Sequence, residues 1–258
     1  MIFAGTALAR RIEAAEASIA RGCAERQLGA AVLEIAGGTV VFQGAASPLS
    51  QAVGLGLNGP VRESELSAIE AFFRSRGAPV TIDLCPLADP GFVECMGRRG
   101  YRITEFNNVL VKPLAAMETA ASPRVRRASA DERERWAHTA GHGFFEQSDL
   151  TDQEMEVGRA IFSMPGALCY LAESETGASE GAAAMVACGG LAELFADSTV
   201  AEFRRRGVHR ELIVARLKEA VALGCDVAAA STAPGSGSQR NYERMGFRVA
   251  YTKATFVG

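Results

Sequence analysis

Four arginines flank Gly207 in the stretch ADSTVAEFRRRGVHRELIVARL, which runs from an expected strand into an expected helix. Arg204, Arg205 and Arg206 precede the glycine, and Arg210 follows it. The first turn of a helix has unpaired N–H groups and a partial positive charge, so it binds anions readily. Glycine lets an oxygen approach the backbone, and guanidinium groups match the geometry of phosphate. The stretch therefore predicts a polyphosphate site; the alternative is a solvated arginine cluster ahead of an ordinary helix.

Hydrophobic periodicity predicts the elements that must position this stretch. The helix over 208–224 is amphipathic, and we expect Leu212, Leu217 and Leu223 on its buried side. In the rest of this half, helices are expected at 131–145, 151–164 and 238–246, and strands at 125–129, 166–174, 181–190, 192–200, 225–232 and 247–257.

The first half of the chain repeats the order of these closing elements. A helix, a glycine, an apolar strand, a short helix and a glycine-aromatic-arginine sequence occur in both halves, with the two glycines 23 residues apart (77 to 100) and 22 residues apart (224 to 246). The repeat favours a duplicated α/β unit. Here helices are expected at 6–27, 63–77 and 88–100, a hairpin at 30–45, strands at 50–57, 79–86 and 101–113, and a linker at 114–123.

These motifs resemble those of the GNAT superfamily of acyl-CoA-dependent N-acetyltransferases. The family's phosphate loop reads Arg/Gln-x-x-Gly-x-Gly/Ala, and the segment from Arg204 to His209 is similar to it. The sequence YERMGF at 242–247 is similar to the Y-E-K-x-G-F ending of many members, and the resemblance covers about 125–258. His209 departs from the pattern: a backbone amide still serves there, and the imidazole either adds a phosphate contact or crowds the loop.

The resemblance implies an α/β (α+β) fold of two GNAT-like mixed-sheet units in tandem. Each unit is expected to have a central, mostly antiparallel, twisted sheet flanked by helices. The catalytic, acetyl-CoA-binding domain is expected at 124–258 and a degenerate GNAT-like domain at 1–116. In the degenerate half GLGLNGPVRESEL replaces the loop, without an arginine cluster and with Pro60 removing an N–H group, and Met96 stands at the position equivalent to Tyr242.

The resemblance also implies residue roles in the transfer of an acetyl group from acetyl-CoA to a primary amine by direct attack. Tyr242 aligns with the tyrosine that often protonates the leaving thiolate; the alternative is an aromatic that anchors a short helix. Glu193 lies where some members place a general base; the alternatives are an exposed strand carboxylate and a catalytic water. The residues expected to bind the cofactor are Thr199, Val200, Arg204, Arg205, Arg206, Gly207, Val208, His209, Arg210 and Ser238.

Composition narrows the class of protein further. The chain is 48% hydrophobic and 22% charged, which is typical of soluble globular proteins. Its 258 residues are enough for two domains. The net charge is −3 and neither half is basic, so no nucleic-acid partner is expected. Six widely spaced cysteines predict reduced, buried thiols. The lack of a long apolar run predicts a cytoplasmic protein without membrane contact.

The acceptor amine stays open among a small metabolite, an amino acid and a protein N-terminus. His138 and His142 lie four residues apart without further metal ligands, so no metal is expected and an acceptor-site role is favoured. One rival function keeps the fold and transfers a longer acyl group. Another is a non-catalytic acyl-CoA sensor or interaction protein, and a third is a nucleotide-phosphate binder unrelated to CoA.

Overall fold

The computed structural model describes residues 5–115 and 122–258, so most of the linker expected at 114–123 lies outside the described residues. The helices are α1 (Thr6–Ala24), α2 (Glu63–Arg74), α3 (Pro90–Arg98), α4 (Arg133–Phe145), α5 (Asp152–Ser163), α6 (Val208–Ala222) and α7 (Gly237–Arg244), with short 3-10 helices η1 (Ala130–Glu132) and η2 (Ala201–Phe203). The strands are β1 (Ala31–Ile35), β2 (Gly38–Phe42), β3 (Gln51–Val53), β4 (Thr81–Leu84), β5 (Arg102–Pro113), β6 (Val125–Arg127), β7 (Leu168–Glu173), β8 (Ser179–Cys188), β9 (Leu191–Thr199), β10 (Val227–Thr232) and β11 (Arg248–Val257).

The order of elements follows the sequence prediction, with one clear difference in the first half. The strand expected at 50–57 ends at Val53. Gly54 and Gly56 have φ angles of 73° and 74°. This left-handed backbone is open to glycine and cannot continue an extended strand. The chain therefore turns immediately after β3.

The strands of the described residues form one hydrogen-bonded series, in the order β1-β2-β3-β4-β11-β5-β10-β9-β8-β7-β6. The expectation of a separate sheet in each half is therefore wrong. The last strand explains the difference: β11, expected to close the second half, pairs antiparallel with β4, and Ala254 lies opposite Leu84. The ladders are mostly antiparallel, as expected, whereas β3–β4 and β9–β10 are parallel.

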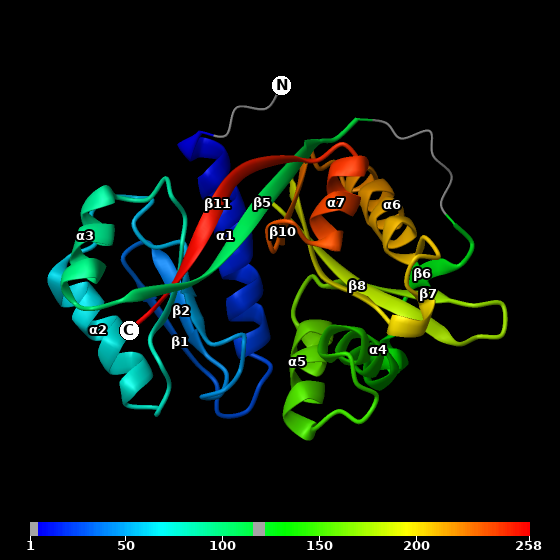
Figure 1. Cartoon of the computed structure of the whole chain (residues 1–258), viewed down its shortest axis with the longest axis horizontal. Coiled ribbons are helices and arrows are strands. Elements are labelled where there is room, and N and C mark those ends of the chain that lie inside the picture. Colours follow the sequence, from blue (N-terminus) through cyan, green and yellow to red (C-terminus); the bar gives the residue numbers. More distant parts are fainter. Residues whose placement is uncertain (1–4, 116–121) are drawn as a thin grey trace. The chain divides into compact units, whose positions relative to one another are not determined.

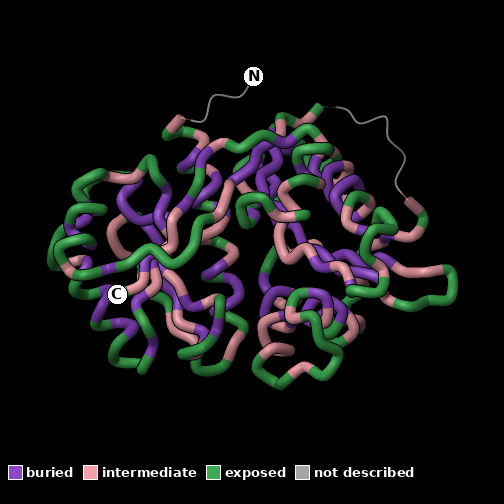
Figure 2. Tube along the Cα trace, viewed as in Figure 1, coloured by how far each residue is buried: buried purple, intermediate pink, exposed green. Residues whose placement is uncertain are grey.

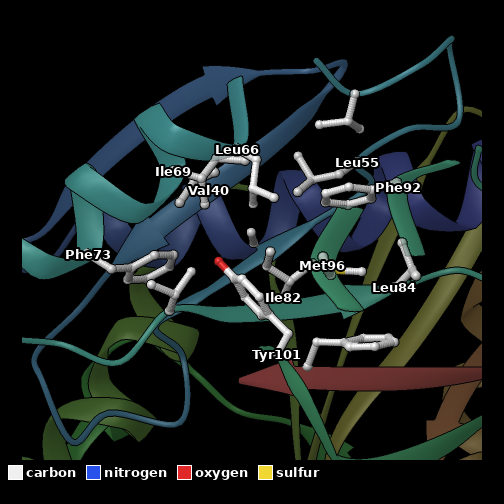
Figure 3. Close-up of a cluster of buried hydrophobic side chains, with 14 of the residues drawn as sticks. Val40, Leu55, Leu66, Ile69, Phe73, Ile82, Leu84, Phe92, Met96 and Tyr101 are labelled. Carbon is white, nitrogen blue, oxygen red and sulfur yellow. The ribbon is translucent and has the colours of Figure 1, made fainter. Parts of the chain in front are cut away.

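The chain divides into two compact units. Unit 1 comprises 1–109, 232–235 and 249–258, and unit 2 comprises 110–231 and 236–248. In unit 1 an apolar core fills the space between the strands and the helices α2 and α3 (Figure 3). Leu66 and Phe73 of α2, Ile82 of β4 and Phe92 and Met96 of α3 are fully buried in it. Burial of these large apolar side chains is the main force that holds α2 and α3 on the sheet.

Unit 1 also contains a buried charge cluster centred on Lys253. Its ammonium lies 3.1 Å from Glu13 Oε2 and 3.0 Å from Asp83 Oδ2, and it also contacts Glu16. Tyr251 donates a hydrogen bond of 3.0 Å from its hydroxyl to Glu13 Oε1. Lys253 and Glu13 are each 1% exposed, so the surrounding carboxyl groups, rather than water, compensate the Lys253 charge.

In unit 2 the helices α6 and α7 lie on one face of the strands, and α4 and α5 lie on the other (Figure 1). The strands between them are largely buried (Figure 2). Helix α4 approaches β9 closely because Gly143 has no side chain: a Cβ there would lie 2.2 Å from Ser198 Oγ. On the same helix, Trp136 donates a hydrogen bond of 3.0 Å from Nε1 to the Tyr170 carbonyl.

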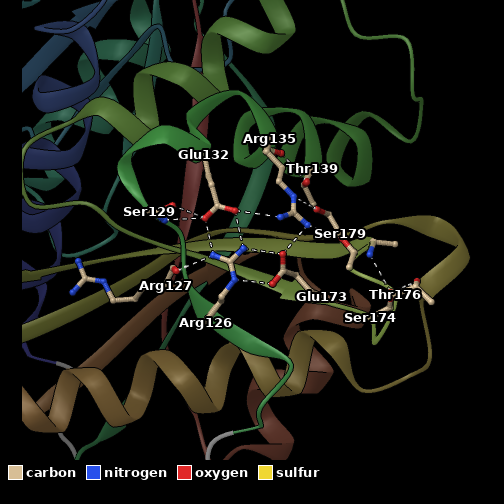
Figure 4. Close-up of polar contacts among 12 residues, drawn as sticks. Arg126, Arg127, Ser129, Glu132, Arg135, Thr139, Glu173, Ser174, Thr176 and Ser179 are labelled. Atoms are coloured by element: carbon tan, nitrogen blue, oxygen red, sulfur yellow. Dashed lines mark hydrogen bonds and ion pairs between the residues drawn. The ribbon is translucent and has the colours of Figure 1, made fainter.

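An arginine-centred network fixes the start of α4 to the sheet (Figure 4). Arg126 of β6 binds both oxygens of Glu132, at 2.6 and 2.7 Å, and both oxygens of Glu173, at 2.7 and 2.8 Å. Arg135 of α4 contacts the same two carboxylates. Hydrogen bonds from Arg126 hold the pKa of Glu132 well below its usual range. Bidentate pairs of this kind set orientation as well as distance.

Two further findings bear on the class of protein. Within the described ranges, no helix is both long enough and apolar enough to cross a membrane. All six cysteines are free thiols; five are buried, as the sequence predicted, and Cys188 is half-buried.

Candidate functional site

The expected phosphate loop connects β9 to α6 and has a backbone suited to an anion. Gly207 caps the start of α6 with φ 83°, and Arg205 has φ 65°. The Glu211 amide donates a bond of 3.1 Å to the Gly207 carbonyl. The amides of 208–210 precede that first helical bond, so they have no partner within the helix. Such amides, together with left-handed residues just before them, form an anion-binding concavity.

Arg204 is held by contacts within the protein. Its guanidinium donates to Glu146 Oε1 at 2.8 Å, to the Gly143 carbonyl at 3.2 Å and to the Thr199 carbonyl at 3.3 Å. These bonds fasten the start of the loop to the end of α4. Arg204 therefore shapes the loop in this structure.

Arg205, Arg206 and Arg210 are exposed on the loop and the first turn of α6. The guanidinium carbon of Arg206 lies 5.4 Å from the centre of the Phe203 ring. Their positive charges lie beside the amides at the start of α6, so a phosphate bound there would contact both the amides and the guanidinium groups. All four arginines are exposed, and Arg204 differs from the other three because its guanidinium bonds to Glu146, Gly143 and Thr199.

The two valines of the predicted set anchor the loop at its ends. Val200 is 3% exposed and Val208 is 1% exposed. The Val200 amide donates a bond of 3.0 Å to the Glu180 carbonyl, and a Cβ at Gly181 would lie 2.9 Å from Val208 Cγ1. Because both side chains are buried, Val200 and Val208 can offer a ligand only their backbone. Thr199, half-buried, already accepts the bond from Arg204.

The parallel strands before the loop separate where the site begins. β10 pairs with β9 over three positions, from Val227 opposite Leu191 to Ala229 opposite Glu193, although both strands continue beyond them. On its other side β9 carries a bulge: its register with β8 shifts between Ala182 and Ala184. Ala196 within that bulge has φ 54°. A bulge turns side chains away from their regular faces.

Glu193, the predicted general base, lies at the last paired position before the strands part. It is opposite Ala229 of β10 and opposite Val186 of β8, and it is 2% exposed. The exposed strand carboxylate considered as its alternative is therefore wrong. Glu193 is a buried carboxylate at the fork between the two parallel strands.

Tyr242, the predicted acid, is fully buried on α7. Its hydroxyl donates a hydrogen bond of 2.6 Å to Asp197 Oδ2. Burial and the Asp197 charge raise the pKa of Tyr242 well above its usual range. Its ring packs edge-on against His209 and Phe247, with centroid distances of 5.5 and 4.9 Å. Tyr242 thus keeps its proton and also anchors α7.

Asp197 and Arg216 form a buried ion pair that the sequence analysis did not predict. Arg216 is 0% exposed and its guanidinium contacts Asp197 Oδ1. Burial alone would raise the pKa of Asp197, but the Arg216 charge holds it well below its usual range. The sequence carried one signal: Arg216 follows Leu212 by four residues, on the face that was expected to be apolar.

His209 points inward from the first turn of α6. Its Nδ1 lies 3.0 Å from Asn241 Nδ2, and its Nε2 lies 3.2 Å from Asp197 Oδ1. The second contact is electrostatic and is not a well-aligned hydrogen bond. Of the two roles considered for this imidazole, neither is seen, because the side chain packs beneath the loop and leaves its outer surface clear.

The remaining candidates lie at separate places. Ser238 is half-buried near the start of α7, whose N-cap residue Ser236 accepts a bond of 3.1 Å from the Gln239 amide. His138 and His142 contact each other on α4 with ring centroids 5.9 Å apart, and His138 Nε2 lies 3.1 Å from the Ser148 carbonyl. Across the described residues, no group of three or more acidic, cysteine or histidine side chains is arranged to hold a metal.

The corresponding loop in unit 1 opposes an anion. Helix α2 begins after Arg62, whose amide already donates a bond of 2.8 Å to Glu65 Oε2. Glu63 also lies in the first turn, and two carboxylates there neutralise the positive end of the helix. A cavity of about 280 Å³ lies between α1 and the β1–β2 hairpin, with Arg21 and Glu34 paired at 2.5 Å in its wall.

Comparison with known proteins adds information about the fold. No family model and no curated protein matches the sequence. Among solved structures, a GCN5-related N-acetyltransferase from Kribbella flavida is similar over 95% of each chain, with 20% identity and a TM-score of 0.68. One from Sphaerobacter thermophilus is similar over 89% of this chain and 75% of its own, with 16% identity and a TM-score of 0.58.

A tandem GNAT protein from the clavulanic acid biosynthesis pathway is similar over 99% of this chain and 94% of its own. Its identity is 15% and the TM-score is 0.61. At such identities the likeness establishes the fold and leaves the activity to be argued from the site. The parted parallel strands, the loop and the whole-length similarity agree: this chain has the fold of the GNAT acetyltransferases, in an arrangement similar to that of a tandem GNAT protein.

Proposed function

We propose that this protein is an acetyl-CoA-dependent N-acetyltransferase that acts on a primary amine. One observation carries the proposal. The arginine-rich loop, in which Arg205 and Gly207 have left-handed backbone, leads into α6, and it follows the part of β9 that no longer pairs with β10. A pyrophosphate group binds where backbone amides and positive charge are available. The extended, amide-bearing arm of CoA binds to strand backbone that has no ladder partner. The loop and the fork supply these two features in succession.

We assign acetyl-CoA binding mainly to the backbone of Arg205 to Arg210, and the exposed arginines add positive charge. The amides at the start of α6 hold the pyrophosphate, and Gly207 admits its oxygens. Thr199 and Val200 lie at the end of β9, where the Val200 amide and carbonyl already bond to Glu180 and Phe203, and Ser238 lies on α7. Arg204 acts by fixing the loop to α4. The acceptor is a small-molecule or peptide amine rather than a nucleic acid.

The transfer proceeds by direct attack. The amine nitrogen bonds to the acetyl carbon, and the carbon–sulfur bond breaks. The amine proton leaves to Glu193, at the fork of the strands, or to a water; the leaving thiolate takes the proton of Tyr242. Glu193 is buried, so little solvent water is present to compete with it for the amine proton. Tyr242 stays protonated until it is used, because its pKa is raised.

A turnover assay tests this function directly. Wild-type protein is incubated with acetyl-CoA and a panel of amino acids, polyamines, amino sugars and free peptide N-termini, and release of the CoA thiol is followed. We expect amine-dependent release that is lost in Tyr242→Phe and kept in Tyr101→Phe, a buried tyrosine of unit 1. Thiol release that does not depend on any amine would contradict an N-acetyltransferase.

The second candidate is an acyl-CoA-binding sensor without turnover. The observation in its favour is that the Tyr242 hydroxyl is buried and already donates to Asp197. The sensor predicts acetyl-CoA binding, no thiol release with any amine, and no effect of Tyr242→Phe on affinity. The enzyme predicts the same affinity in that variant but a large loss of rate, so the two functions separate in the rate measurement.

A further inference from the structure

We propose that Asp197 is a positioning residue of this site, which holds the Tyr242 hydroxyl with one carboxylate oxygen and the His209 imidazole of the phosphate loop with the other. This inference rests on the proposed function for its catalytic meaning. That one carboxylate links α7 to the start of α6 follows from its contacts with Tyr242 and His209 alone.

The carboxylate is itself held in a fixed place and charge state. Arg216 is fully buried and spreads its donors over four neighbours: Asp197 Oδ1 and the carbonyls of Leu212 at 3.1 Å, Ala184 at 3.0 Å and Phe195 at 3.4 Å. Burial lowers the pKa of Arg216, but the Asp197 charge more than offsets this and raises it. The bulge of β9 at Ala196 supplies the turn in the strand just before Asp197. Asp197 is therefore an ionised, oriented acceptor.

The first contact of Asp197 fixes the tyrosine. The bond of 2.6 Å between the Tyr242 hydroxyl and Oδ2 is short, as expected for a charged acceptor. Edge-on packing against His209 and Phe247 prevents the ring from tilting away. The phenol hydrogen is thereby held on Asp197 Oδ2, so it must leave this bond when it passes to a thiolate.

The second contact of Asp197 fixes the loop. Asn241 Nδ2 is a donor, so His209 Nδ1 accepts, and an imidazole proton is assigned to Nε2, the atom that lies 3.2 Å from Asp197 Oδ1 in an electrostatic contact. His209 lies in the first turn of α6, the turn whose amides would bind pyrophosphate. The loop and the proposed acid consequently share one anchor.

This arrangement has a consequence for proton transfer. Asp197 disfavours the phenolate of Tyr242, and Arg216 favours it. With the carboxylate present, Tyr242 remains protonated at high pH. When Tyr242 gives its proton to the thiolate, the phenolate is left beside the Arg216 guanidinium. Removal of the carboxylate lowers the pKa of Tyr242, so the tyrosine loses its proton at a lower pH than in the wild type.

The experiment compares wild type with Asp197→Asn and with Asp197→Asn/Arg216→Gln. The double variant leaves no unpaired buried charge, so it is the one to use if the single variant does not fold. Tyrosine ionisation is followed by ultraviolet difference absorbance in folded protein, with Tyr242→Phe added to each background to identify the signal among the four tyrosines. The pH dependence of kcat is measured alongside it.

The matched control is Glu70→Gln in unit 1, because Glu70 Oε1 accepts a bond of 3.3 Å from the buried Tyr101 hydroxyl. We expect Asp197→Asn to ionise Tyr242 at least about one pH unit lower than wild type, and kcat to fall on the basic side at a correspondingly lower pH. The double variant also loses the Arg216 charge that favours the phenolate, so it should ionise Tyr242 at a higher pH than Asp197→Asn does. The Glu70 variant is expected to alter only Tyr101 and to leave the kcat profile unchanged.

Identical Tyr242 ionisation in wild type and the Asp197 variants would overturn the proposal, and so would a lowered Tyr242 pKa with no change in the kcat profile. Failure of the proposed function gives a different result. In that case wild type shows no amine-dependent thiol release, while the tyrosine ionisation still decides whether Asp197 holds Tyr242.

Discussion

The Tyr242 hydroxyl on α7 and Asp197 Oδ2 on β9 lie 2.6 Å apart, in a site where Tyr242 is fully buried and the Asp197 side chain is 14% exposed. The bond joins the residue expected to act as the acid to a carboxylate that the sequence analysis had passed over. A charged acceptor makes this one of the stronger hydrogen bonds in the unit. It explains how Tyr242 can combine its proposed role as a proton donor with its role as the anchor of α7.

Replacement of Tyr242 by phenylalanine tests both roles. Loss of the proton donor should lower kcat by about 100-fold. Loss of a hydrogen bond to a charged group should also lower the free energy of unfolding, by about 1.5–3 kcal/mol. Acetyl-CoA affinity should be unchanged, because Tyr242 is buried away from the loop surface. Steady-state kinetics and urea unfolding check the three outcomes; an unchanged kcat would exclude the acid role.

Gly207 and Gly224 provide a matched pair for the phosphate loop. Both have left-handed backbone, with φ 83° and 76°, and they flank α6 at its start and its end. A tryptophan at either position should cost a similar strain of about 1–2 kcal/mol. Only Gly207→Trp should abolish acetyl-CoA binding in a calorimetric titration. Equal affinity in the two variants would remove the loop from the site.

The arginines of the loop should separate into two classes. Arg205→Gln should weaken acetyl-CoA binding about tenfold and reduce its dependence on salt, with no change in stability. Arg204→Gln should weaken binding with less change in the salt dependence, because its bonds to Glu146, Gly143 and Thr199 act inside the protein. Dissociation constants at low and high salt measure the difference. The same salt slope in both variants would contradict this assignment.

Glu13 should give unit 1 a characteristic pH dependence. Burial raises the pKa of Glu13 from 4.5 to about 7 despite the nearby Lys253. Between these values the folded state holds a proton that the unfolded state releases, so stability falls as pH rises.

Urea unfolding of wild type and Glu13→Gln checks this sign. The free energy of unfolding of wild type should fall across that pH range relative to Glu13→Gln, with exposed Glu25→Gln as the control. A parallel pH dependence in wild type and Glu13→Gln would show that Glu13 does not carry the effect.

The sequence was sufficient to predict the order of elements and the loop before α6 that we propose binds phosphate. The arginines around Gly207 and the hydrophobic periodicity of 208–224 are local features of the sequence. Both indicate the helix that the structure shows to begin at Val208. Leu212 and Leu217 are buried as expected. Leu223 is 51% exposed because α6 ends at Ala222 and the chain turns there.

Long-range relationships could not be predicted in this way. The pairing of β11 with β4 joins strands about 170 residues apart, and no local pattern specifies it. Burial of Arg216 depends on Asp197, and Asp197 reaches it through a bulge that alternation along β9 does not indicate. His209 was likewise ambiguous from sequence, since its direction is set by Asn241 on another helix.

The most direct test of the central claim is a calorimetric titration of the protein with acetyl-CoA at two salt concentrations, with ATP as the control ligand. We expect micromolar acetyl-CoA binding that weakens at higher salt, because exposed arginines would contact the phosphates, and no heat with ATP. No binding at millimolar acetyl-CoA would contradict it and leave a GNAT fold without an acyl-CoA site. Equal binding of ATP would instead indicate a general nucleotide-phosphate site.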